Sequence, residues 1–295
     1  MATTHSAELS ELHVDPVGPF TGFGNFFRKE LTDWWKSTRL IVVFVLPMLV
    51  MLVIVIFFND MMKEIERAGR NGDQPAELKK SLLATIVLLF MFQKPVLMFV
   101  IIVIFSTMSL LTTEKYTGTL AWNLTKPLSR TALFTAKWLA AVIAIWVAMC
   151  VLPISIASLL IMTISGVTPE FSKMAPIVGA SLLWIGFWVL LMLTISLFFQ
   201  SQAAVGAIGI TLWIIPNALG ELLKNVLGEA KGRWFDDCFA PNCASWWYTI
   251  AADKDLMPMA RDAAVPDAWM IAFAIWSAVL IVFSLWVFNR QEIGS

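Results

Sequence analysis

The sequence WLAAVIAIWVAMCVLPISIASLLIMTIS occupies residues Trp138–Ser165 and contains no charged side chain. A helix needs roughly 20 apolar residues to cross the hydrocarbon core of a bilayer, and this stretch is long enough. Within the bilayer a helix is favoured because it satisfies its own backbone hydrogen bonds. The stretch therefore predicts a transmembrane helix.

Other runs of the chain have the same apolar character. The run at residues 81–111 contains Gln93, Lys94 and Pro95, so we place its membrane-spanning part after these residues. Together the runs predict an all-α polytopic membrane protein with six transmembrane helices, whose even number puts both termini on one side. Within a transmembrane domain at residues 39–295, the expected spans are 40–58, 95–111, 138–165, 176–199, 203–219 and 268–288.

The composition of the whole chain agrees with a membrane-embedded fold. Of its 295 residues, 59% are hydrophobic and 14% are charged, whereas a soluble domain has about 25% charged residues. The spans and their connectors take up nearly all of the length, which excludes a separate soluble catalytic domain. The 21 basic residues are balanced by 21 acidic ones, so the chain has no basic excess for binding nucleic acid.

An amphipathic segment precedes the first span. Residues 1–20 form a polar tail, and residues 21–38 carry aromatic and leucine side chains on one half of a helix and charged side chains on the other, which is typical of an interfacial helix. Glu30 lies in the apolar half, where an unpaired carboxylate is costly. Two interpretations stay open: snorkelling or pairing with a base in the same helix, or contact with a partner subunit or with the loop after the second span.

A simple count of basic residues does not settle the orientation of the spans. With the N-terminus in the cytoplasm, fewer than half of the 21 Lys and Arg residues lie on the cytoplasmic side, contrary to the positive-inside tendency. The outer basic residues are diluted among acidic ones in long loops, where basic charge has less weight. The inner basic residues cluster at helix ends, so we expect the N-terminus inside.

The loop after the second span reads TEKYTGTLAWNLTKPLSR at Thr113–Arg130. Gly118 permits a backbone conformation that is closed to other residues. Pro127 ends helical continuation, and Ser129 is a good N-cap for the helix that leads into the third span. These residues predict a rigid, shaped surface at the edge of the membrane.

This loop resembles the signature loop of ABC-2 type transporter permeases, in which an acidic residue precedes Gly-Thr-Leu, a short apolar stretch, Pro-x-Ser-Arg and a Lys at the next helix. The sequence FRKEL at Phe27–Leu31 is similar to the elbow helix of that family. The resemblance implies an ABC-2, type V exporter-like permease fold and a cytoplasmic coupling loop at residues 112–137 that faces an ATPase. It assigns ATPase coupling to Glu30, Glu114, Gly118, Thr119, Leu120, Pro127, Ser129, Arg130 and Lys137. Ordinary membrane anchoring is the alternative for Lys115, Arg130 and Lys137.

The resemblance also implies partners. The chain contains no Gly-x-x-x-x-Gly-Lys-Ser/Thr phosphate loop, so ATP and Mg are expected to bind to separate ABC ATPase subunits. The chain itself is then not an enzyme and needs no cofactor or metal of its own. A second permease copy or a paralogue is implied, with a homodimer expected. The expected location is the bacterial cytoplasmic (inner) membrane, with both termini in the cytoplasm.

Two functions from different classes stay open. The first is an ATP-driven permease that moves a substrate across or out of the membrane. The second is a membrane anchor or assembly subunit that recruits an ATPase to mature or remodel an envelope protein, such as a metalloenzyme, with a periplasmic partner. Membrane lipid is an expected partner in either case. A secondary transporter ranks behind both because the spans are almost free of ionisable residues.

Two features of the outer segments have alternative interpretations. The outer loop at residues 221–267 contains Cys238 and Cys243, which form a local disulfide if this side is oxidising and otherwise are two free thiols. Lys94 lies in a long apolar run, where a charge marks a transport pathway or snorkels to the membrane surface. We favour snorkelling because Lys94 falls at the outer edge of its span.

Overall fold

The computed structural model describes residues 18–68, 96–124, 128–166, 168–169, 171–228, 235 and 268–290. Every regular element within these ranges is a helix, and the described part of the chain contains no strand. Six of its helical stretches are long and apolar enough to cross a membrane. The prediction of an all-α protein with six membrane-spanning helices is therefore confirmed.

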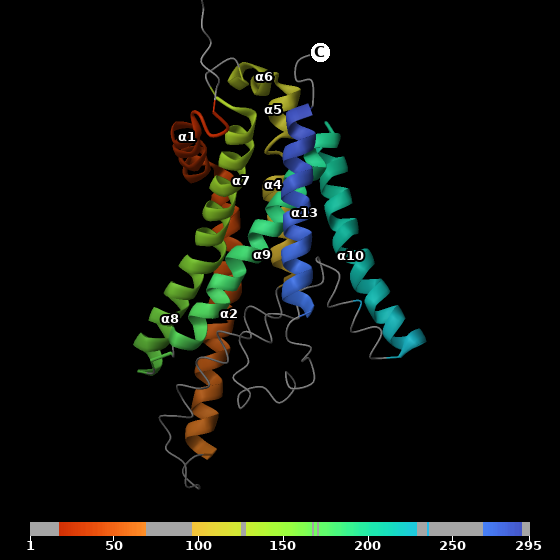
Figure 1. Ribbon diagram of the computed structural model, residues 1–295. Coiled ribbons are helices and arrows are strands. Elements are labelled where there is room, and N and C mark those ends of the chain that lie inside the picture. The colour runs from red at the N-terminus through yellow and green to blue at the C-terminus, as the bar shows by residue number, and fades with distance from the viewer. Residues whose placement is uncertain are drawn as a thin grey trace, which may run out of the picture.

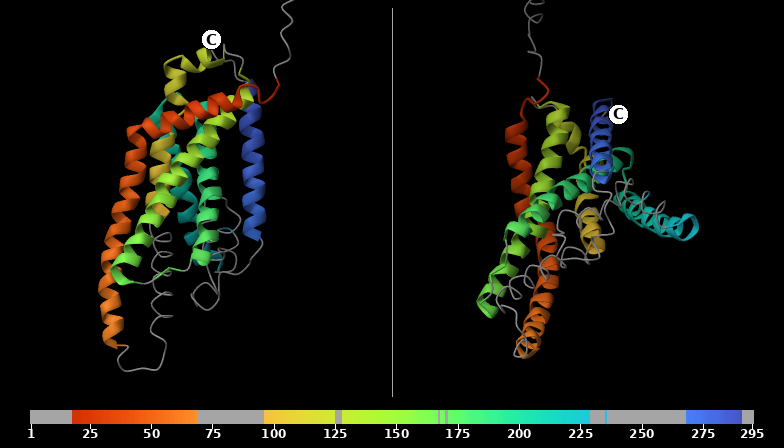
Figure 2. Two further views of the ribbon diagram at one scale, coloured as in Figure 1. Left: turned by 90° about the vertical axis from the view of Figure 1, so that its left-hand side faces the viewer. Right: turned by 60° about the horizontal axis from the view of Figure 1, so that its bottom comes forward.

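The long helices run from one end of a bundle to the other (Figure 1). α1 (Phe23–Lys36) lies across one end of this bundle (Figure 2), and α5 (Thr112–Tyr116) and α6 (Thr119–Leu124) lie at the same end. We call it the α1 end. The spans are α2 (Thr38–Ala68), α4 (Val96–Thr107), α7 (Arg130–Trp146) with α8 (Leu152–Ser165), α9 (Phe171–Phe198), α10 (Gln202–Leu227) and α13 (Ala268–Arg290).

The third span is a long helix with a wide turn inside it. α7 begins at Arg130 because Ser129 caps it: the Ala132 N–H donates to Ser129 Oγ at 3.1 Å. The expected cap is therefore confirmed. A π-helical turn at Val147–Val151 joins α7 to α8. Pro153 follows this turn and has no N–H to donate to the turn before it, a break that a π turn accommodates.

α9 is the central helix of the described bundle. It contacts α4, α7, α10 and α13, and its large side chain Trp188 is fully buried. Hydrogen bonds join it to its neighbours: Trp138 Nε1 of α7 donates to Gly186 O at 2.9 Å, and Thr194 Oγ1 lies 2.5 Å from Ser284 Oγ of α13. Polar groups in hydrocarbon need such partners, so these bonds help to hold the spans together.

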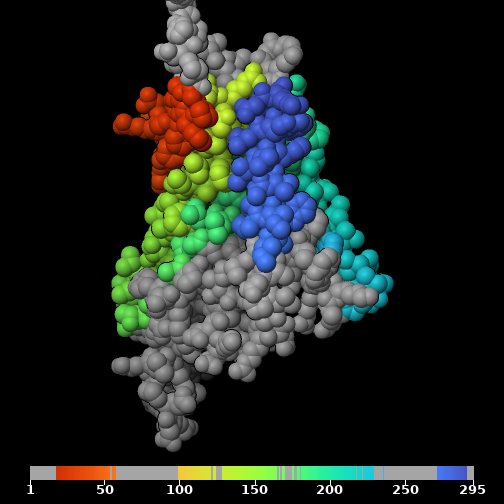
Figure 3. All heavy atoms as spheres, viewed as in Figure 1, coloured from red at the N-terminus to blue at the C-terminus, as the bar shows by residue number. Residues whose placement is uncertain are grey.

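The outer faces of several spans expose apolar side chains. On α13, which runs along the face of the molecule in Figure 3, Val282 is 68% exposed and Trp286 is 52% exposed. A large patch of this kind is uncommon on a soluble monomer. In a bilayer it costs little, because lipid tails are as apolar as the side chains that they cover.

Some of the predicted features lie outside the described residues. They are Lys94, Pro127, Cys238, Cys243 and most of the connector at residues 221–267. The alternatives given above for Lys94 and for the two cysteines therefore stay open.

Candidate functional site

α1 packs against α7 at the α1 end. The buried residues of α1 are Phe26, Glu30 and Trp34, which are four positions apart and so lie on one side of the helix. The two aromatic side chains need only apolar neighbours. Glu30 needs a donor or a cation, because burying an unpaired carboxylate is costly.

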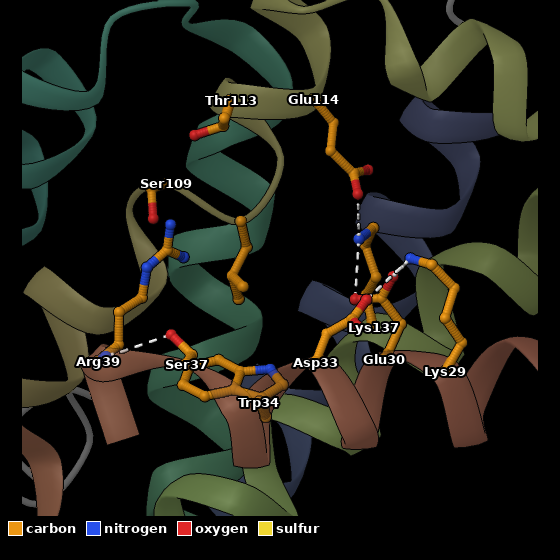
Figure 4. Close-up of a pocket in the computed structure, with 11 residues that line it drawn as sticks. Lys29, Glu30, Asp33, Trp34, Ser37, Arg39, Ser109, Thr113, Glu114 and Lys137 are labelled. Atoms are coloured by element: carbon orange, nitrogen blue, oxygen red, sulfur yellow. Dashed lines mark hydrogen bonds and ion pairs between the residues drawn. The ribbon is translucent and has the colours of Figure 1, made fainter. Parts of the chain in front are cut away.

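Lys137 of α7 supplies that cation. Its Nζ lies 3.0 Å from Glu30 Oε2 and 2.7 Å from Glu114 Oε1 of α5 (Figure 4), and the Lys137 side chain is only 3% exposed. One buried ammonium thus joins carboxylates from two other helices. We call Glu30, Glu114 and Lys137 the charge triad.

Both interpretations of Glu30 describe part of its surroundings. Within α1, Lys29 Nζ lies 3.2 Å from Glu30 Oε1 and 3.1 Å from Asp33 Oδ2. Burial opposes the charged form of Lys29, but the carboxylates of Glu30 and Asp33 outweigh it and raise the pKa of Lys29. Glu30 therefore pairs with a base of its own helix and, through Lys137, with the end of the predicted coupling loop.

The charge triad has two carboxylates for one lysine. Glu114 Oε2 is buried and has no hydrogen-bond partner among the described residues, and a buried acceptor without a donor costs about 1–3 kcal/mol. Lys137 Nζ also lies 5.5 Å from the centre of the Phe26 ring, which adds a cation–π attraction. Lys137 consequently links α1, α5 and α7 through its side chain.

Two other basic residues bind the ends of more distant spans. Lys115 Nζ donates to the carbonyl oxygens of Ser196 and Leu197, at 2.9 and 2.5 Å, near the end of α9. Arg130 Nη1 donates to Asn289 O, at 3.0 Å, near the end of α13. The last carbonyls of a helix lack donors within the helix and favour a cation. Ordinary membrane anchoring stays an open alternative for both residues.

Ser129 fixes the segment that leads into α1. Its Oγ donates to Pro19 O, and its backbone N–H donates to Thr21 O at 3.3 Å. The same Oγ accepts the cap hydrogen bond of α7. The starts of α1 and α7 are therefore held together by one side chain.

α5 and α6 form a corner at the α1 end (Figure 1). Gly118 connects them with a φ of +70°, a left-handed conformation that favours glycine, so the expectation for Gly118 is confirmed. Thr119 is exposed at the start of α6, and Leu120 is 1% exposed and packs inward. The corner is thus anchored by an apolar side chain beneath an exposed backbone turn.

Two aromatic residues of this corner were not predicted from the sequence to be functional. Tyr116 is 88% exposed and Trp122 is 63% exposed. Trp122 lies on α6 between Leu120 and Asn123, which are both buried, so it faces away from the bundle. The sequence feature that could have identified them is the presence of two large aromatic residues in a polar loop between spans.

The predicted coupling residues occupy several places in this region. The structure brings Glu30, Glu114 and Lys137 together in the charge triad, and the remaining described members are Gly118, Thr119 and Leu120 at the α5–α6 corner and Ser129 and Arg130 at the start of α7. Pro127 lies outside the described residues. The arrangement is suited to transmitting movement between helices, because α5 is linked to α1, α7 and α9 by charged side chains. A coupling role for these residues stays a prediction.

No curated protein matches this chain. The family model described as ABC-2 family transporter protein matches residues 25–293, a range that includes most of α1, the charge triad, the α5–α6 corner and all of the spans. The match extends over nearly the whole chain of 295 residues. The chain therefore belongs to the ABC-2 transporter family and is a transmembrane component of an ABC transporter.

Proposed function

We propose that this chain is the permease subunit of an ATP-binding cassette transporter, in which ATP hydrolysis by a separate subunit drives movement of a substrate across or out of the membrane. Family membership and the six membrane-capable helices support a transmembrane role without catalysis. ATP and Mg are bound by the partner ATPase. This chain contributes the spans and the surface on which the ATPase docks.

The observation that carries the proposal is the linkage of the α5–α6 corner to the spans. On its inner side, Glu114 pairs with Lys137 of α7, and Lys115 binds the end of α9. On its outer side, Tyr116 and Trp122 are exposed. A partner that binds the outer side can therefore displace several spans together, because closely packed helices that are joined by buried ion pairs move as a unit.

Near this corner, charged side chains hold the helices together and exposed aromatic side chains are available to bind a partner. Enclosed charges such as Lys137 hold the helices in register, because its ammonium is already committed to two carboxylates. Exposed aromatic residues are the side chains most often responsible for binding energy at protein interfaces. The docking surface for the ATPase thus centres on Tyr116, Gly118, Thr119 and Trp122.

The proposed assembly contains two such chains and two ATPase subunits in a bacterial cytoplasmic (inner) membrane. The exposed apolar faces of α2, α10 and α13 offer surface for lipid and for a second copy. The α1 end faces the cytoplasm, because a soluble ATPase must reach α5 and α6. The end of α13 lies at the same end of the bundle, as its contact with Arg130 indicates, so both termini are cytoplasmic.

The purified chain alone is expected to hydrolyse no ATP, because its sequence contains no phosphate loop. Coexpressed with the ABC ATPases of its own genome, the chain is expected to copurify with one of them as a complex that hydrolyses ATP. Phosphate release assays on both preparations check this. ATP hydrolysis by the isolated chain, or failure of all of these ATPases to bind it, would contradict the proposal.

Cysteine labelling tests the orientation of the chain in the membrane. In a background lacking Cys150, Cys238 and Cys243, a cysteine at the exposed Thr119 should react with a membrane-impermeant maleimide only in inside-out vesicles. A cysteine at the exposed Thr163, near the far end of α8, should react only in whole spheroplasts. The opposite labelling pattern would place the α5–α6 corner outside and remove the ATPase docking assignment.

A further inference from the structure

A pocket of about 260 Å³ lies beside the charge triad, between the corner that joins α1 to α2 and the segment that joins α4 to α5. One water molecule takes up about 30 Å³ of liquid, so the pocket has space for a small polar group. It lies next to the interfacial helix α1 and the start of the first span. An interfacial helix lies at the level of the lipid headgroups.

One wall of the pocket is a set of hydrogen-bond donors around Arg39. Among the described residues, no carboxylate forms an ion pair with the Arg39 guanidinium. Ser109 lines the same pocket, and in Figure 4 its hydroxyl points toward that guanidinium. Ser109 is only 7% exposed, and its Oγ lines the pocket without a hydrogen bond to any described residue. Thr113 Oγ1 accepts a hydrogen bond from Gln202 at 2.9 Å, which leaves its own hydroxyl proton to donate. An arginine with neighbouring hydroxyls is a favourable donor set for a phosphate.

The opposite wall carries an excess of negative charge. It contains the carboxylates of Glu30, Asp33 and Glu114 and the ammonium groups of Lys29 and Lys137. Both lysines are already engaged by these carboxylates, at distances of 2.7 to 3.2 Å. One unit of negative charge is left over, and it faces the wall that holds Arg39. The pocket as a whole is neutral with a cationic wall and an anionic wall.

We propose that this pocket binds the zwitterionic headgroup of a phosphoethanolamine lipid, with the phosphate on Arg39 and Ser109 and the ammonium toward Asp33 and Glu114. The two walls match the two charges of such a headgroup. A phosphoglycerol headgroup has no cation for the anionic wall, and a phosphocholine headgroup has no N–H to donate to the carboxylates. Free dianionic phosphate is repelled by the anionic wall. The proposal does not depend on ATPase coupling.

Bound lipid would join two parts of the chain. Arg39 lies near the start of α2, and Ser109 and Thr113 lie between α4 and α5. A headgroup that contacts all three therefore ties the first span to the α5–α6 corner. The lipid also fills a polar pocket that faces the charge triad, and so completes the packing of the α1 end.

The test uses the full chain, purified in detergent and freed of lipid. Native mass spectrometry and thermal unfolding are measured with added dioleoyl phosphoethanolamine, phosphocholine and phosphoglycerol lipids, and with inorganic phosphate and soluble phosphoethanolamine. We expect retention and thermal stabilisation by the phosphoethanolamine lipid in preference to the other two lipids. Arg39→Gln should weaken this retention about tenfold or more, as expected for loss of a charged hydrogen bond. Arg28→Gln is the matched control, because it removes an exposed charge from α1 that does not line the pocket.

Ser109→Ala tests the proposal if Arg39→Gln fails to insert into the membrane. Removing a hydroxyl that has no described partner should leave the lipid-free protein as stable as before, yet weaken retention of the phosphoethanolamine lipid. The proposal is overturned by equal retention of the three lipids, or by unchanged retention in both variants. Stabilisation by inorganic phosphate equal to that by the lipid would also overturn it, since this result indicates a plain anion site.

Discussion

Lys137→Met is expected to lower the free energy of unfolding of the purified chain by roughly 3–5 kcal/mol, the usual cost of removing one partner from a buried ion pair. The variant leaves Glu30 and Glu114 facing each other without a cation in a site where the side chains are 8% and 18% exposed. Reversible unfolding in mixed micelles measures the change. The same variant should lose association with the ATPase, because α1, α5 and α7 no longer share a fixed contact.

Lys36→Met is the matched control for Lys137→Met. Lys36 is exposed on the last turn of α1, and surface substitutions of this kind change stability by about 0.5 kcal/mol or less. Glu30→Ala and Glu114→Ala should each cost less than Lys137→Met, because Lys137 keeps one carboxylate in either variant. Combining Lys137→Met with Glu30→Gln and Glu114→Gln should restore much of the stability, since a neutral replacement of a buried ion pair is often tolerated. Equal stability of the Lys137 and Lys36 variants would show that the charge triad does not hold the helices together.

Trp122→Ala is expected to weaken association with the ATPase by about 2 kcal/mol or more, which is roughly thirtyfold in Kd. Trp122 is a large aromatic side chain that is 63% exposed on α6 and faces away from the bundle. Desolvating such a side chain against a partner contributes far more than a contact at the rim of an interface. The Kd is determined by titrating the detergent-purified chain with the ATPase in a surface binding assay.

Trp286→Ala controls for the general loss of an exposed tryptophan. Trp286 is 52% exposed on α13 and lines an apolar groove with Val282 and Phe283, and it does not belong to the proposed docking surface. This variant should bind the ATPase with unchanged Kd, and Tyr116→Ala should behave like Trp122→Ala. Normal ATPase binding by both corner variants would remove the α5–α6 corner from the interface.

Much of the fold could be predicted from local sequence. The apolar runs predicted six spans, and the amphipathic pattern before the first span predicted an interfacial helix, which corresponds to α1 with its buried Phe26 and Trp34. The Ser129 cap and the left-handed Gly118 were also predicted, because both depend on residues a few positions away. The family resemblance was carried by the same short stretches and is confirmed by the match over residues 25–293.

The partners of the charged residues could not be predicted in this way. Lys115 and Lys137 look alike in the sequence, yet one binds the end of α9 and the other joins α1 to α5. Arg130 is separated by 159 positions from the carbonyl group that it binds on Asn289. A sequence pattern of a few residues cannot indicate a contact between positions so far apart in the chain.

The sequence by itself determined that six segments are apolar enough to cross a membrane, that Ser129 caps α7 and that the chain turns at Gly118, because a bilayer and a helix cap both act on residues that are close along the chain. Only the tertiary structure decided that Glu30 and Glu114 share Lys137, that Leu120 is buried beneath the α5–α6 corner, and that Trp122 faces outward. These outcomes depend on how the spans pack around α9. Packing brings together side chains from different helices and so sets both which charges are paired and which surfaces stay open.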